Sequence, residues 1–177
     1  MEDYKQLLTK LNETIWDYAE LKFCEHHSAQ AMADVMRDQG FEVEMGLAGM
    51  DTAFTAKAGA GHPVIGLLAE FDALSGLSQC ANVVHPCPRE GTGNGHGCGH
   101  NLLGTASVGA ALMLRDYLKE SGRSGTVVLV GCPAEEGGSG KAYLARAGVF
   151  DGLDVALTWH PGGGNAVMTG SMQANCQ

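Results

Sequence analysis

The sequence predicts an α/β fold, with a mostly parallel or mixed central sheet and helices on both of its faces. Segments with helical spacing of apolar residues alternate along the chain with short segments that are typical of strands. In addition, the 177 residues are 45% hydrophobic and only 18% charged, so the chain can bury one core. These observations indicate one globular α/β domain.

The predicted helices begin with an amphipathic stripe at the N-terminus. Apolar side chains recur there at three- and four-residue spacing, at Tyr4, Leu7, Leu8, Leu11, Ile15 and Tyr18. A second helix is expected over residues 28–39. A third begins at Asn101 and ends at Gly122 or Gly125, and a short fourth helix is expected over residues 139–147.

The predicted strands lie between these helices, and a long loop separates two of them. Strands are expected at residues 41–45, 53–58, 64–69, 126–131, 155–159 and 166–172. The run 64–69 is continuously apolar, as in a central strand that is buried on both faces. Residues 72–100 have no period and are rich in Gly, Pro, Asn and Ser. A loop of this length is uncommon in a compact domain unless it is functional.

Charge and cysteine content exclude several classes of protein. A net charge of -9 and a pI near 5.1 leave no basic face for nucleic acid. The polar N-terminus is unlike a signal peptide, and no apolar run is long enough to span a membrane, so we expect no membrane partner. The six cysteines are irregularly spaced, so we expect them to stay unpaired in a reducing cytoplasm.

Residues that can bind divalent metal follow the predicted strands. Asp72, the pair Glu135 and Glu136, and His160 each come just after an apolar strand. The loop that carries Cys98 and His100 leads directly into a helix. Because ligands of α/β sheets bind beyond the carboxyl ends of the strands, these segments can converge on one rim. Thiolate, imidazole and carboxylate together form a donor set for divalent metal.

Each of these elements has a simpler alternative. The Cys98-Gly99-His100 loop can be a glycine-rich turn before a helix, with Asn101 as the N-cap. Glu135 and Glu136 can be a solvated helix N-terminus, where acids interact well with the helix dipole. A single His or Asp after a strand is often an ordinary polar residue. Only their combination favours a metal site.

Four motifs contain these residues: Ala-Glu-Phe-Asp-Ala-Leu at 69–74, Gly-Cys-Gly-His-Asn-Leu-Leu-Gly at 97–104, Pro-Ala-Glu-Glu-Gly-Gly at 133–138 and Thr-Trp-His-Pro at 158–161. Together they resemble the amidohydrolase branch of the aminoacylase and carboxypeptidase-G type metallopeptidases. This branch includes aminobenzoyl-glutamate hydrolase and the auxin-conjugate amidohydrolases. The motifs occur in the family's order and span almost the whole chain.

The resemblance implies a cleft with two divalent ions, zinc or manganese, that activate water for hydrolysis of an amide bond. It implies that the metal ligands are Cys98, His100, Glu136 and His160. It also implies that Glu135 is the general acid/base and that Asp72 orients the site. The expected substrate is a small amide, an N-acyl or aryl-acyl amino acid or a dipeptide of the aminobenzoyl-glutamate kind.

The sequence departs from the family pattern in three ways. Asn101 stands where many relatives carry Asp, and Glu70 stands where the aminoacylase branch carries a ligand His. Family members also have an inserted lid domain, which contributes dimer contacts, and a return segment with one more ligand His. We therefore expect residues 1–177 to be the N-terminal portion of a catalytic domain, of low activity alone, from a full-length protein that forms a homodimer.

Two other classes compete with the enzyme. One is a non-catalytic binding or interaction module that keeps the fold but has an incomplete metal site. The other is a structural zinc protein, which needs four closed ligands and unfolds when a chelator removes the metal.

Overall fold

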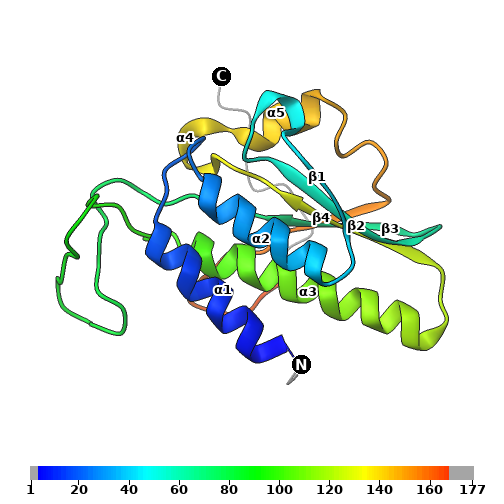
Figure 1. Cartoon of the computed structure of the whole chain (residues 1–177), viewed down its shortest axis with the longest axis horizontal. Coiled ribbons are helices and arrows are strands. Elements are labelled where there is room, and N and C mark those ends of the chain that lie inside the picture. The colour runs from blue at the N-terminus through cyan, green and yellow to red at the C-terminus, as the bar shows by residue number, and fades with distance from the viewer. Residues whose placement is uncertain (1–3, 168–177) are drawn as a thin grey trace.

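A computed structural model describes residues 4–167 and contains a five-stranded mixed sheet in the order β1-β2-β4-β3-β5 (Figure 1). The three strands β4, β3 and β5 are parallel, whereas β2 is antiparallel to β4 and to β1. The strands are β1 (Glu42–Met45), β2 (Phe54–Ala60), β3 (Val64–Ala69), β4 (Gly125–Gly131) and β5 (Val155–Leu157). The predicted mixed sheet is therefore confirmed.

Helices cover both faces of this sheet. One face is covered by α1 (Lys5–Tyr18), α2 (His26–Asp38) and α3 (His100–Ser121), as Figure 1 shows. The opposite face packs against the short helix η2 (Leu47–Gly49), α5 (Gly140–Arg146) and the residues that follow α5. Because the sheet is covered on both sides, every residue of β4 is buried, which explains its continuous apolar run.

The predicted elements agree with the structure, with small differences at their ends. The first predicted helix is α1, and the second, α2, begins two residues earlier than expected. The last predicted strand, 166–172, falls mostly outside the described residues, and its first two positions are in no strand. At α3 the N-cap is Gly99, in the left-handed region with φ of 78°. The alternative in which Asn101 caps this helix is therefore wrong.

The predicted loop connects β3 to α3 and projects from the body of the molecule (Figure 1). Cys80 and Cys87 form a disulfide within it. The expectation that the cysteines stay unpaired is wrong for this pair. The loop folds back on itself, so that the Cys80 N–H donates to the Cys87 carbonyl, and the spacing of the cysteines in the sequence does not reveal this.

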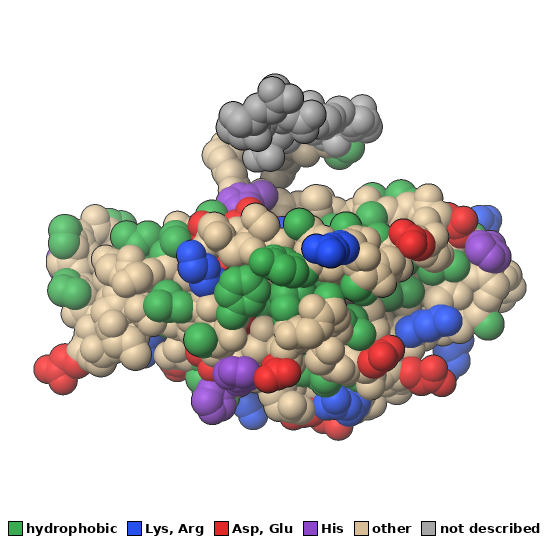
Figure 2. Space-filling view, turned by 90° about the horizontal axis from the view of Figure 1, so that it is seen from above, with side chains coloured by type: hydrophobic (Ala, Val, Ile, Leu, Met, Phe, Trp, Pro, Cys, Tyr) green, Lys and Arg blue, Asp and Glu red, His purple; other side chains and the backbone are tan. Residues whose placement is uncertain are grey.

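On the side that Figure 2 shows, Lys and Arg side chains are scattered among acidic and apolar ones. Among residues 4–167, no helix combines the length and the apolar character needed to cross a membrane.

Glu20 holds the start of α2 from outside the helix. Its carboxylate accepts the backbone N–H groups of His27 and Ser28, at 3.0 and 2.8 Å, and the Ser28 hydroxyl at 2.8 Å. Burial opposes ionisation, but these hydrogen bonds outweigh it and lower the pKa of Glu20 below its ordinary value of 4.5. A carboxyl group with a lowered pKa stabilises the fold above its unfolded pKa.

We expect Glu20→Gln to lower the free energy of unfolding by about 1–2 kcal/mol at pH 7, because hydrogen bonds to a charged acceptor are lost. The stabilisation by Glu20 disappears as the pH falls below about 4.5, since wild type then becomes neutral at this position too. Urea unfolding at pH 7 and at lower pH measures the difference. The exposed Glu13→Gln on α1 is the control, and an equal loss at both pH values would contradict the ionic role of Glu20.

Candidate metal centre

The carboxyl ends of the three parallel strands meet at one edge of the sheet. Glu70 and Asp72 follow β3, the α4 turn (Glu135–Gly138) follows β4, and His160 follows β5. This geometry explains why side chains from segments far apart in the sequence come together. Asp72, for example, accepts the backbone N–H of Glu136 through Oδ2 at 2.8 Å.

The glycine-rich loop brings a thiol and an imidazole to the same edge. Cys98 Sγ lies 3.2 Å from His160 Nε2, and the rings of His100 and His160 meet edge to face with centroids 5.8 Å apart. Gly99, between Cys98 and His100, has a positive φ, and a Cβ there would lie 3.0 Å from Pro161 Cγ. A residue with a side chain would therefore be strained at position 99 and would crowd the His160 segment.

His100 is fully buried and its ring orientation is fixed by Asp72. Its Nδ1 lies 3.0 Å from Asp72 Oδ1 and 3.1 Å from the Asp72 carbonyl oxygen. Both of these atoms are acceptors, so Nδ1 carries a proton and donates it. The other nitrogen, Nε2, is left to face the acids of the site, which is the usual arrangement of a metal-binding imidazole with a carboxylate behind it.

Several buried atoms at this edge have no hydrogen-bond partner among residues 4–167. At the centre of the site they are His100 Nε2, Glu136 Oε1 and Glu70 Oε2. Buried polar atoms normally find partners, and unpaired ones call for an explanation such as a bound ion. A divalent cation fits these imidazole and carboxylate donors.

Two groups of donors share His100. Cys98, His100 and His160 form one, and Glu70, His100 and Glu135 form the other, with the donor atoms of each group within 4.8 Å of one another. Asp72 and Glu136 also lie beside His100, 3.0 and 3.9 Å from its ring nitrogens. The structure therefore brings together all six residues that the sequence singled out, and it adds Glu70.

Glu135 and Glu136 differ in burial although each has an oxygen 3.9 Å from His100 Nε2. The Glu135 side chain is 41% exposed, whereas that of Glu136 is 22% exposed with Oε1 buried and unpaired. The two acids do begin a single turn, α4, as the helix N-terminus alternative predicts. The buried oxygen of Glu136 is not expected for an acid that merely caps a solvated turn.

The electrostatics of the site favour a cation. Burial, followed by the neighbouring Glu136, raises the pKa of the Cys98 thiol to about 11. Burial disfavours the imidazolium of His100, but the hydrogen bond and charge of Asp72 outweigh it and raise the pKa of His100. The negative charge of Glu136 and Asp72 thus contributes to both shifts, and the same charge would attract a divalent ion.

Asp72 remains ionised beneath the site. Burial opposes its charge, but hydrogen bonds from His100 and from the Glu136 backbone lower the pKa of this carboxyl group. Asp72 is itself almost fully buried. It therefore links the His100 ring to the α4 turn.

Sequence reasoning missed Glu25, a fully buried acid just before α2. Its Oε1 accepts the Ala134 N–H at 2.7 Å, and its Oε2 accepts the Thr52 hydroxyl at 3.1 Å. Ala134 has a positive φ of 57°, a strained conformation immediately before Glu135. Glu25 thus holds the backbone that presents the two acids, and no pattern in the sequence indicated this contact.

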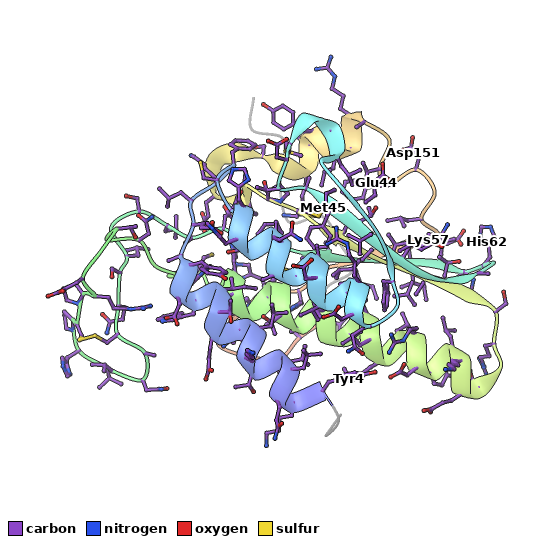
Figure 3. All side chains as sticks on the ribbon, viewed as in Figure 1. Tyr4, Glu44, Met45, Lys57, His62 and Asp151 are labelled. Atoms are coloured by element: carbon purple, nitrogen blue, oxygen red, sulfur yellow. A yellow bond between two sulfur atoms is a disulfide. The ribbon has the colours of Figure 1, made fainter. Side chains whose placement is uncertain are left out.

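His96 and His62 are not members of either donor group. His96 is buried beside α1, where its Nε2 lies 2.9 Å from the Ile15 carbonyl oxygen, so it anchors the loop as expected for a loop residue. His62 is exposed and contacts Asp154, and it lies at the far end of the sheet in Figure 3.

An α/β sheet with these donors beyond its parallel strands has the architecture of a metallopeptidase. Residues 66–173, more than half of the chain, match Peptidase family M20/M25/M40, and the chain belongs to this family. The resemblance inferred from the four motifs is confirmed.

Curated relatives agree with this assignment. The chain is 48% identical over 161 residues to one of the subunits of p-aminobenzoyl-glutamate hydrolase of Escherichia coli K12, covering 91% of this chain and 34% of the relative. It is 32% identical over 187 residues to human Xaa-Arg dipeptidase, covering 94% of this chain and 38% of the relative. The chain thus spans little more than a third of the length of these relatives.

Solved structures share the fold. The YXEP protein of Bacillus subtilis, described as a dinuclear metal binding peptidase of the M20 family, is 25% identical with a TM-score of 0.69, over 86% of this chain and 42% of that chain. The aminobenzoyl-glutamate utilization protein of Klebsiella pneumoniae has a TM-score of 0.64 at 17% identity, over 91% of this chain and 45% of that chain. The second likeness concerns the fold alone.

Proposed function

We propose that this chain carries most of the active site of an amidohydrolase that uses two divalent ions, zinc or manganese. The observation that supports it best is the donor set around His100, in which His100 Nε2, Glu136 Oε1 and Glu70 Oε2 are buried without hydrogen-bond partners among residues 4–167. The dinuclear metal binding of the B. subtilis relative supports the same conclusion.

In this proposal Cys98, His100, Glu136 and His160 hold the ions, and Asp72 orients His100. Divalent ions bound there would polarise the amide carbonyl and make water more acidic near neutral pH. Glu135, the more exposed of the paired acids, accepts the proton of the attacking water and passes it to the leaving amine. Its exposure leaves it free for this exchange.

The proposed substrates are small amides, such as N-acyl or aryl-acyl amino acids or dipeptides. Support comes from the relatives, which are named for p-aminobenzoyl-glutamate and for Xaa-Arg dipeptides. We further propose that residues 1–177 form the N-terminal portion of a catalytic domain whose longer protein is a cytoplasmic homodimer. Because Glu135 and His160 are exposed to solvent, the 177-residue chain alone should hydrolyse such amides slowly.

Metal removal tests the proposed function. We expect the longer protein that contains this chain to hydrolyse p-aminobenzoyl-glutamate, to lose at least about 90% of this activity with a chelator, and to recover it with zinc or manganese, because bound ions supply the electrophile. Hydrolysis that is insensitive to the chelator would contradict the proposal. The 177-residue chain, assayed in parallel, should bind the metal but react slowly.

The same chelation experiment separates the two competing classes. A non-catalytic binding module would take up metal without hydrolysing any amide of this class. A structural zinc protein would lose its cooperative thermal unfolding when the metal is removed. We expect the fold to persist, because the core of residues 4–167 packs without involving the donor residues.

A further inference from the structure

Glu70 is a buried acid whose two carboxylate oxygens have different surroundings. It directly follows β3, and its side chain is 7% exposed. Lys141, on α5, donates a hydrogen bond to Oε1. The other oxygen, Oε2, is buried and has no hydrogen-bond partner among the described residues. One oxygen is therefore neutralised by a lysine, and the other is held free inside the protein.

The free oxygen of Glu70 faces the free nitrogen of His100. Glu70 Oε2 and His100 Nε2 are 3.2 Å apart, yet their geometry is not that of a hydrogen bond, and neither atom has another partner among residues 4–167. Two donors that bind one ion, each about 2.0–2.2 Å from it, lie roughly 2.8–3.6 Å apart. The pair thus has the separation of two ligands of the same ion.

We propose that Glu70 is a ligand of the divalent ion that His100 binds, through Oε2. This inference rests on the proposed function and adds to its four ligands a fifth, which stands where the aminoacylase branch carries a His. Glu135, the proposed general acid/base, lies beside this pair, with an oxygen within 4.8 Å of both donor atoms. Carboxylate and imidazole are both ligands that zinc and manganese accept.

Lys141 limits how Glu70 can bind. Because Oε1 is engaged by the ammonium group, only Oε2 is available, so Glu70 would bind the ion through one oxygen. The competing explanation is that the Glu70–Lys141 pair only fastens α5 to the end of β3. The two explanations predict different metal affinities for a variant that lacks Lys141 but keeps the Glu70 carboxylate. Metal binding should persist if Glu70 is a ligand, and it should weaken if only the ion pair matters.

Cobalt(II) titration of the metal-free 177-residue chain, followed by visible absorption, tests the assignment. We expect Glu70→Gln to weaken cobalt binding by at least about 100-fold, more than the 10–100-fold typical of residues that only support a ligand, and to change the spectrum, because one anionic oxygen ligand is lost. Lys141→Met should keep the affinity within about threefold of wild type. The charge-matched control is Glu44→Gln, an exposed acid on β1, which β2 and β4 separate from β3 in the sheet (Figure 3).

Two results would overturn the inference. One is an unchanged affinity and spectrum in Glu70→Gln, and the other is an equal loss in Glu70→Gln and Lys141→Met, which would assign the pair a structural role. If Glu70→Gln does not fold, judged by thermal unfolding, Glu70→Asp replaces it. That variant should keep an oxygen ligand and bind cobalt with intermediate affinity, and wild-type or abolished binding in it would count against the assignment.

A failure of this inference is distinguishable from a failure of the proposed function. Cys98→Ala serves as the reference variant in the same titration. If Cys98→Ala weakens cobalt binding and Glu70→Gln does not, the assignment of Glu70 as a ligand is wrong and the proposed metal centre is unaffected. If the wild-type chain itself binds no cobalt, both the proposed metal centre and the assignment of Glu70 are wrong.

Discussion

Glu135→Gln is expected to lower kcat for amide hydrolysis by about 10²–10⁴-fold, because the amide cannot accept and return the proton. The change keeps the size of the side chain. Metal content should stay at the wild-type level, since Glu135 is the more exposed of the two acids, whereas Glu136 has the buried free oxygen. The assay is steady-state hydrolysis by the longer protein, with elemental analysis of the same samples.

Glu136→Gln is the matched comparison, because it changes the adjacent acid in the same way. It should lose metal as well as activity, which the proposed ligand role of Glu136 requires. Glu120→Gln, at an exposed position near the end of α3, controls for the loss of one charge. If Glu135→Gln loses as much metal as Glu136→Gln, the division of tasks between the two acids is wrong.

His100→Gln is expected to weaken metal binding by at least about 100-fold. This is more than the 10–100-fold that is typical when a residue hydrogen-bonded to a ligand is replaced. The reason is its position, since His100 is the donor shared by both groups. Activity of the longer protein should fall to background. Metal retained after gel filtration is the measurement, with circular dichroism to establish that the variant is folded.

His62→Gln is the control for His100→Gln. His62 is exposed and precedes β3, whereas Glu70 follows it. Figure 3 shows His62 at the end of the sheet that lies away from α4. Its replacement should leave metal content unchanged. Wild-type metal content in a folded His100→Gln protein would remove His100 from the ligand set.

Much of the fold was predictable because the apolar pattern is local. The stripe through Leu11 and Ile15 and the unbroken apolar run of β4 specify helix and strand without reference to the rest of the chain. The disulfide between Cys80 and Cys87 was not predictable, since it depends on how one irregular loop folds back.

The candidate site was predictable only as a set of residue types. Asp72, Glu135 and His160 each follow an apolar run, and parallel strands end at one edge, so their convergence could be expected. The same pattern could not separate Glu135 from Glu136, which are adjacent in sequence and differ in burial only through the turn of α4.

The sequence by itself determined the alternation of helices and strands, the family, and the donor types near the sheet edge, because these depend on composition and spacing. The tertiary structure alone decided which atoms of the described residues are left without partners. It fixed His100 Nε2 by directing Nδ1 to Asp72, and it turned Glu70 Oε2 inward by pairing the other oxygen with Lys141. Contacts between residues up to 71 positions apart set these orientations, and the local sequence pattern does not predict such contacts.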